Sequence, residues 1–545
     1  MLQDNKYLQL TVGGIAFIIA IPLIAILFLS FYAEELMWEH YLSTVFPNYL
    51  LNTIIYTFGS CFVATVLGTT SAWIVSSTNI PGRNILNWVL LFPFAIPAYV
   101  VAFVYAEFFE YSGLIQTVYR WFFNYKSYTE YSFFNFRSMG GAIFVSSIVM
   151  YPYVFLMARP AFVQQAGYVL EITKTMGHSS LNSFFKVSLP IAMPSILVGS
   201  ILVLMETMGD FGVVSLLGVY TLTFVIYDVW LEINDVGFAA QIALVMLVFV
   251  FLLIYLDKIY RNKQKIYLST NSLVKPFRLI QLSKGQKIFS LVFCWGLFVV
   301  GFAIPALILL DYSIRFFDQA YTDKFNEYLF NSLNLAVIGV FFVMLFSIVL
   351  GYYDRCKKPF KINNFLISFC RIGYAVPGSV LAIGVVIPFS MFDNFVDEYM
   401  IKYFDISTGL LISGGSILLI YAYVVKFINI GVGAVESSLQ RVSHTMDDVA
   451  LLMGHKKFSI MSKIHFPLIK VGLISGSIII FVDIIKELPA TLLLRPFNYE
   501  TLATFVYQYA SDDLIEQASM GALIMVLLGM IPVSMLCYFT NTNSK

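Results

Sequence analysis

The sequence predicts an all-α integral membrane protein with about twelve transmembrane helices, arranged as two tandem six-helix halves. Three observations lead to this fold class. First, 59% of the 545 residues are hydrophobic and only 12% are charged, whereas soluble domains carry about 25% charged residues. Second, apolar runs of membrane-spanning length recur along the chain. Third, features of the first half return 277 to 280 positions later.

The apolar runs begin with residues 10–32. Their 23 residues exceed a typical signal-peptide core and suit a span of about 20 residues. No clear small-x-small cleavage site follows, so we expect this run to remain as the first helix. Every span should be helical, because a backbone in lipid must satisfy its own hydrogen bonds. The candidate spans are 10–32, 52–76, 86–107, 139–159, 192–215, 237–257, 288–310, 328–352, 364–392, 408–430, 469–490 and 517–540.

The Lys and Arg residues indicate the orientation, because they collect in cytoplasmic loops. The segment 258–287 carries eight of them beside a single acid, Asp257, and the loop 353–363 carries four more. The loops on the opposite side are acidic. Six spans per half then place both chain termini in the cytoplasm. The basic segment joins the two halves, and we interpret it as a solvated linker without a binding role.

The two halves resemble each other in several places. The stretch "FAIPAYVVAFVY" around Pro97 is similar to "YAVPGSVLAIGVV" around Pro377. Likewise "LLNTIIYTFG" near Asn52 is similar to "LFNSLNLAVIG" near Asn331. A repeat of several helices predicts a duplicated bundle related by a pseudo-two-fold axis. Because each copy has six spans, both copies share one orientation and the axis runs along the membrane normal.

Each half also contains a polar elbow between two spans. The first is "EITKTMGHSSLNSFFKVSLP" (171–190) and the second is "DVALLMGHKKFSIMSKIHFP" (448–467). Each pattern indicates a helix, a glycine stop and a second short amphipathic helix, with a proline opening the next span. Such a helix on the cytoplasmic face could lie on lipid or fit the groove of a partner. The alternative is an interfacial helix that only anchors the bundle.

The elbows resemble the EAA loop of bacterial ABC importer permeases, EAA-x3-G-x9-I-x-LP. Ile172 and Thr173 replace the two alanines in the first copy, and Asp448 replaces glutamate in the second. The resemblance implies the type I ABC importer permease fold, with each loop seated as a coupling helix in a cleft of an ATP-binding subunit. The coupling-loop residues that it implies are Glu171, Gly177, His178, Leu189, Pro190, Asp448, Gly454, His455, Ile464 and Pro467.

Two further segments, 205–230 and 486–510, look like parts of fused ferric-iron transporter permeases. This resemblance implies a bacterial inner-membrane subunit that receives ferric iron from a periplasmic binding protein, with two copies of the ATP-binding subunit on the cytoplasmic face. The implied domains are 1–47 for the first helix and outer loop, 48–257 for the first permease domain, 258–287 for the basic cytoplasmic linker, 288–327 for the seventh helix and outer loop, and 328–540 for the second permease domain.

The chain offers no catalytic motif of its own. It lacks a GxxxxGK[ST] phosphate-binding loop, an HExxH motif and a nucleophile elbow. We therefore expect a transport subunit that is not an enzyme and binds no cofactor, while ATP and Mg are used by the partner subunit. The net charge of +1 indicates no nucleic-acid partner. The five scattered cysteines form neither a disulfide framework nor a zinc site.

Four acids in the spans are candidate pathway or gate residues. They form two pairs with a spacing of four, which places each pair on one helix face. A charge near the bilayer centre costs roughly 2.5–3.5 kcal/mol, which favours a wet pathway over lipid, and oxygen ligands suit hard cations. Alternatively, these acids pair with Lys486 or Arg495, or face water at the outer surface. The candidates, which are also possible metal ligands, are Glu206, Asp210, Asp483 and Glu487.

Three other functions fit parts of the sequence. The same transporter class could carry thiamine, a polyamine or a phosphonate. A secondary carrier driven by a proton or sodium gradient could use the buried acids as a relay. A membrane scaffold without transport activity would show no substrate-dependent ATP hydrolysis with its partners.

Overall fold

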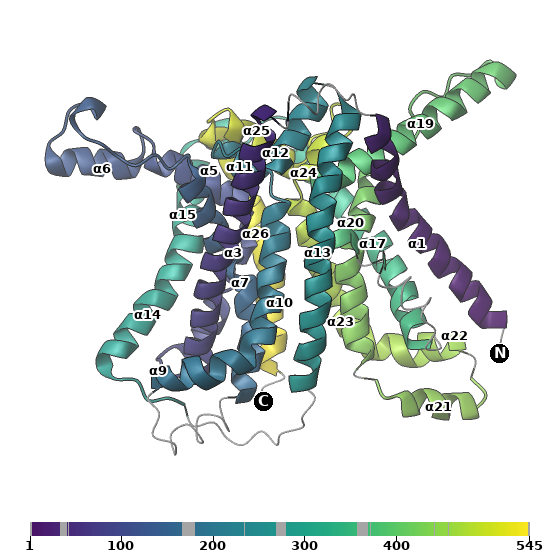
Figure 1. The fold of residues 1–545 in the computed structure, drawn as a ribbon, viewed down its shortest axis with the longest axis horizontal. Helices are drawn as coiled ribbons and strands as arrows, with labels where there is room; N and C mark the ends of the chain where they lie inside the picture. The colour runs from purple at the N-terminus through teal and green to yellow at the C-terminus, as the bar shows by residue number, and fades with distance from the viewer. Residues whose placement is uncertain are drawn as a thin grey trace. The chain divides into compact units, whose positions relative to one another are not determined.

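The computed structural model describes residues 3–32, 41, 43–165, 180–233, 235–268, 279–356, 369–370, 372–440, 442–455 and 457–542. In these ranges the chain is helical almost throughout, and twelve helices are long and apolar enough to cross a membrane (Figure 1). Within the described ranges, the β-structure consists of one isolated bridge between Thr78 and Ile280. The predicted all-α membrane fold is confirmed.

The chain divides into two compact units. The second-half unit comprises Met1–Trp38, Ile226–Val245 and Asp323–Phe505, and the first-half unit comprises Glu39–Val225, Met246–Thr322 and Val506–Lys545. Three helices have residues in both units: α12 (Leu222–Asp228), α13 (Val236–Leu268) and α25 (Leu502–Ser511).

The core of the first-half unit is a group of three mutually packed helices, α3 (Phe46–Ser77), α7 (Met139–Gln165) and α10 (Leu189–Met208). Glycines allow their close approach: a Cβ at Gly68 would lie 2.6 Å from the Tyr151 carbonyl oxygen. The other helices of this unit are α4 (Arg83–Val89), α5 (Ala98–Phe109), α6 (Leu114–Phe123), α9 (Ser180–Ser183), α11 (Gly212–Leu216), α14 (Lys284–Phe298), α15 (Ile304–Arg315), α16 (Phe317–Ala320) and α26 (Ile515–Thr542).

The second-half unit repeats this core with α17 (Phe325–Cys356), α20 (Ser416–Leu439) and α23 (Phe466–Lys486). Its other helices are α1 (Gln3–Leu29), α19 (Gly378–Phe404), α21 (His444–Leu452), α22 (Lys457–Ile460) and α24 (Pro489–Leu494). The repeat predicted from the sequence is thus visible as two equivalent three-helix cores.

The first span of each half packs in the unit named for the other half. Helix α1 packs on α19, where a Cβ at Gly384 would lie 2.4 Å from the Pro22 carbonyl oxygen. The Tyr421 hydroxyl of α20 also donates to the Ile18 carbonyl at 2.5 Å. Helix α15, in the seventh span, packs on α5 and α26. The domain bounds predicted from the sequence assign these first spans, 1–47 and 288–327, to neither permease domain. Those bounds stay a prediction.

The third span differs from the continuous helix expected over 86–107. Helix α4 ends at Val89, a short 3-10 turn covers Phe92–Ala95, and Ile96 and Pro97 are extended before α5 begins. In the second half, Pro377 likewise directly precedes α19. Both prolines therefore stand at the start of a helix, where the missing N–H leaves no helical hydrogen bond unmade.

Candidate functional site

The second elbow has the predicted helix, glycine stop and second helix. Helix α21 starts after Ser443, whose side chain accepts from the Thr445 N–H at 3.2 Å. It ends at Leu452, and Gly454, two residues later, has φ +84° and donates to the Leu451 carbonyl at 3.0 Å. This left-handed residue stops the helix. Helix α22 and a π-helical turn then continue directly into α23.

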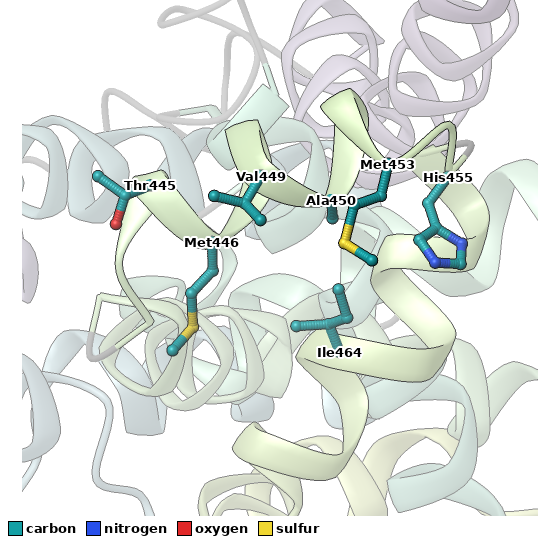
Figure 2. Close-up of a pocket in the computed structure, with 7 residues that line it drawn as sticks. All are labelled: Thr445, Met446, Val449, Ala450, Met453, His455 and Ile464. Atoms are coloured by element: carbon teal, nitrogen blue, oxygen red, sulfur yellow. The ribbon is translucent and has the colours of Figure 1, made fainter.

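An apolar groove lies at this elbow. Leu452 is 88% exposed, and Met446, Val449 and Met453 are also exposed. Figure 2 shows side chains of α21 and of the following π-helical turn around a cavity, which we call the elbow groove. Its volume is about 350 Å³. An exposed apolar patch of this kind is typical of a protein-interaction surface. The elbow groove is lined by Thr445, Met446, Val449, Ala450, Met453, His455 and Ile464.

The coupling residues of the second elbow do not all meet at the groove. His455 and Ile464 line it, and Gly454 ends the helix beside it. Asp448 is exposed on α21 and Pro467 is exposed near the start of α23, and neither lines the groove. Of the predicted coupling residues of the second elbow, only His455 and Ile464 lie together at the elbow groove.

Sequence reasoning missed a polar cluster behind the groove, which we call the elbow clamp. It consists of Arg355, Asp447 and His465. The Asp447 carboxylate accepts from Arg355 Nε at 2.8 Å and from His465 Nε2 at 2.6 Å. The Arg355 and His465 side chains are buried. The clamp therefore ties α21 to the end of α17 and to the π-helical turn that precedes α23.

Arg355 also holds the chain that leads into α21. Its guanidinium donates to the carbonyls of Leu439 at 2.7 Å and Val442 at 3.0 Å. Burial alone would raise the pKa of the Asp447 carboxyl, but the hydrogen bonds from Arg355 and His465 hold this pKa below its usual value. The sequence contained a signal for this cluster, because two acids, Asp447 and Asp448, stand side by side. Neighbouring residues point to different faces of a helix, so one of the two could face the bundle.

The first elbow is described only in its last part. Glu171, Gly177 and His178 lie outside the described residues. Leu189 and Pro190 open α10, directly after a π-helical turn over Phe184–Ser188. The second elbow has the same kind of turn at Met461–His465, 277 positions later. The two copies therefore share an entry into the following span.

Asp210 lies just past the end of α10, at the start of a short helix. Its carboxylate accepts from the Tyr56 hydroxyl at 2.5 Å and from the Val213 N–H at 3.2 Å. The Tyr56 hydroxyl also lies 2.6 Å from Ser146 Oγ. Asp210 thus caps α11 and joins it to α3.

Glu487 occupies the matching position after α23. It accepts from the N–H groups of Ala490 at 3.0 Å and Thr491 at 2.9 Å, and so caps α24. Its side chain is 1% exposed and forms an ion pair with Lys426 at 2.9 Å. The sequence offered Lys486 or Arg495 as cations for the four acids; in the structure Glu487 pairs with Lys426, and Arg495 forms an ion pair with Glu500.

The acids one turn earlier, Glu206 and Asp483, are half-buried on α10 and α23. Among the described residues, no group of three or more His, Cys, Asp or Glu side chains is placed to hold a metal ion. The arrangement of Asp210 and Glu487 is that of helix caps, with their oxygens engaged by N–H and hydroxyl donors.

Comparison with known proteins places these features in a family. The family described as "Binding-protein-dependent transport system inner membrane component" matches residues 64–265 and 344–542. The Fe(3+)-transport system permease protein FbpB 2 of Haemophilus influenzae is 22% identical over 92% of this chain and 91% of its own length. The ferric transport system permease protein FbpB of Actinobacillus pleuropneumoniae is 20% identical over 94% of this chain and 75% of its own. The sulfate transport system permease protein CysT of Escherichia coli is 24% identical over 37% of this chain and 71% of its own.

Proposed function

Because the chain belongs to the family of binding-protein-dependent transport system inner membrane components, we propose that it is the permease of an ATP-driven importer whose cargo is ferric iron. The observation that supports this cargo is the share of the chain that each relative matches. The two ferric permeases match more than nine tenths of the chain, including both halves, whereas the sulfate permease matches 37% of it. If both halves together form the path for the cargo, relatives that contain both halves are the better guide to that cargo.

The elbows are the proposed docking sites for two copies of the ATP-binding subunit, which would use ATP and Mg. The second elbow exposes the apolar side chains of Val449, Leu452 and Met453 at α21, as expected for a helix that inserts into a partner. The Lys and Arg residues of the linker and the loop support our proposal that this face and both termini are cytoplasmic. A periplasmic binding protein would then deliver the cargo on the opposite face.

The elbow clamp would carry movement of the docked α21 into the bundle. Asp447 connects α21 to α17 through Arg355 and to the start of α23 through His465. Charge-assisted hydrogen bonds are short and directional, so a displaced α21 would move both spans. Such a ligand-driven switch requires the ATP-binding subunit to bind one conformation better than the other.

The four intramembrane acids divide into two roles in this proposal. Asp210 and Glu487 hold the short helices α11 and α24 at the outer ends of their spans, because their oxygens serve as caps. Glu206 and Asp483 remain the candidates for a pathway or gate surface.

Reconstitution in vesicles with the ATP-binding subunit and the binding protein tests the cargo. We expect binding protein loaded with ferric iron to stimulate ATP hydrolysis and to drive radioactive iron into the vesicles. Stimulation by sulfate, thiamine or a polyamine, without stimulation by iron, would overturn the cargo. Iron uptake that continues without ATP and stops with an ionophore would instead support a secondary carrier.

Docking at the second elbow has a separate test. Met453→Asp places a charge in the elbow groove, where Met453 is 74% exposed, and should reduce recovery of the ATP-binding subunit with the detergent-solubilised chain. Phe497→Asp is the matched control, because Phe497 is a fully exposed apolar residue between α24 and α25. Equal recovery with both variants would argue against the groove as the docking site.

A further inference from the structure

Between α5 and α7 the chain forms an arm, residues 110–138, that contains α6. Figure 1 shows α6 lying sideways to α5 and α7. None of its ten residues is buried in the protein. The arm contains no residue assigned to coupling, cargo or gating, so its exposed surface has no role in the function proposed above.

The polar face of α6 is covered by the arm itself. Gln116 donates to the Phe109 carbonyl at 2.8 Å and accepts from the Tyr131 hydroxyl at 2.6 Å. Arg120 donates to the Tyr111 carbonyl at 2.7 Å and to the Tyr131 hydroxyl at 3.1 Å. These contacts fix the rotation of the helix about its own axis.

The opposite face of α6 is apolar and open. Leu114, Val118, Trp121 and Phe122 follow one another at helical spacing on one side. Trp121 is 81% exposed and Phe122 is 72% exposed, and Leu114 and Val118 are exposed as well. None of the four lines the cavity between the arm and the end of α5. Burial of large apolar side chains is worth about 1.5–3 kcal/mol each, which is a strong reason for this face to be covered.

The connection of the arm limits what can cover it. Helices α5 and α6 together make up the apolar stretch Ala98–Phe123, which has the length and composition of a membrane span, but residues 110–113 break the helix between them. A linker of this length reaches at most roughly 17 Å, so α6 stays near the membrane surface. The arm also returns directly to a span, because α7 begins at Met139. These two short connections keep the apolar face of α6 close to the lipid-facing surface of the bundle.

The length and composition of α6 match the lipid interface. Ten residues are too few to cross a bilayer, which needs about 20. Trp and Tyr gather where acyl chains meet headgroups, and the arm carries Trp121 with Tyr111, Tyr119 and Tyr125. We propose that α6 is an interfacial helix, with Leu114, Val118, Trp121 and Phe122 inserted into the leaflet on the side opposite the first elbow. This proposal does not depend on the cargo.

Tryptophan fluorescence of the full chain in vesicles tests the proposal. The emission of Trp121 is obtained as the difference between the unchanged chain and Trp121→Phe. We expect phosphatidylcholine brominated on its acyl chains near the headgroup to quench this difference, and aqueous iodide to leave it unchanged. Trp295→Phe gives the lipid reference, because Trp295 is partly exposed on the spanning helix α14.

Phe497→Trp in the Trp121→Phe background gives the water reference, because position 497 is fully exposed in a loop. Quenching of Trp121 by iodide and not by brominated lipid would overturn the proposal. Protection from iodide that appears only after addition of the binding protein would also overturn it and would identify the arm as a docking surface for that protein.

Discussion

The two halves of the chain use different chemistry at matched positions. Asp210 and Glu487 both follow a long span and both cap a short helix. In the first half the carboxylate meets the Tyr56 hydroxyl. In the second half it is almost fully buried and meets the Lys426 ammonium. The repeat has kept the geometry of the cap but has changed its partner from a neutral group to a charge.

The same contrast occurs at the elbows. In the second half the elbow clamp joins Arg355, Asp447 and His465 by charge-assisted hydrogen bonds. The matched positions of the first half are Ser76, Leu170 and Ser188. Charged clamps are directional but intolerant of the loss of one partner. The second half should therefore be the more sensitive to substitution and to pH.

The largest effect is expected at Lys426. Lys426→Met leaves the Glu487 carboxylate buried without its cation, which costs about 3–5 kcal/mol. In the first half, Tyr56→Phe removes one hydrogen bond to Asp210 and should cost about 1.5–3 kcal/mol. Thermal denaturation of the purified chain in detergent measures both variants.

A double variant checks the physical reason for this difference. Lys426→Met combined with Glu487→Gln removes the buried charge and leaves an amide oxygen to cap α24. Most of the lost stability should return. Failure of the second substitution to restore stability would show that Lys426 acts by packing and not by neutralising Glu487.

A smaller effect is expected at the elbow clamp. Arg355→Ala removes the cation beside Asp447 and the donor to two backbone carbonyls, which should cost about 2–3 kcal/mol. It should also lower the amount of substrate imported per ATP hydrolysed in reconstituted vesicles. Ser76→Ala, at the matched position, should change stability by less than about 1 kcal/mol. Equal loss of coupling in the two variants would contradict the proposed asymmetry.

The pH dependence follows from the lowered pKa of Asp447. Its carboxyl has a lower pKa in the folded chain than the unfolded value of about 3.9. The stability that it contributes is therefore complete above pH 4 and is lost as the pH falls through the folded pKa. The difference in melting temperature between the unchanged chain and Asp447→Asn should shrink below about pH 4. A constant difference over that range would mean that the Asp447 charge is not involved.

The sequence was sufficient for the helices, because lipid permits few alternatives to them. It was also sufficient for the glycine stop at Gly454, since a left-handed helix end favours that residue. It was insufficient for Glu487, whose cation is on α20, 61 positions earlier in the chain. Pro489, at the first position of α24, was a local signal that a helix begins there and that Glu487 could cap it.

The elbow clamp was not predicted for a related reason. Alignment of the two elbows selected Asp448, because it matches Glu171 at the common offset. The neighbouring Asp447 has a leucine as its counterpart, so the repeat gave it no weight. Contacts that exist in one copy cannot be found from what the copies share, and they require the three-dimensional approach of α17, α21 and the turn before α23.

The smallest effect is expected at the glycine stops. Gly454 has φ +84°, and a Cβ there would meet no atom within 4 Å. Gly454→Ala should therefore cost only the left-handed backbone strain, about 1–2 kcal/mol. Gly177→Ala should cost the same if the first elbow also ends its helix in this way. Gly454→Pro cannot reach a positive φ, so it should displace α22 and uncouple ATP hydrolysis from uptake. Thermal denaturation of the two alanine variants measures the comparison, and a cost at Gly454 without one at Gly177 would mean that the elbows share a sequence pattern but not a turn.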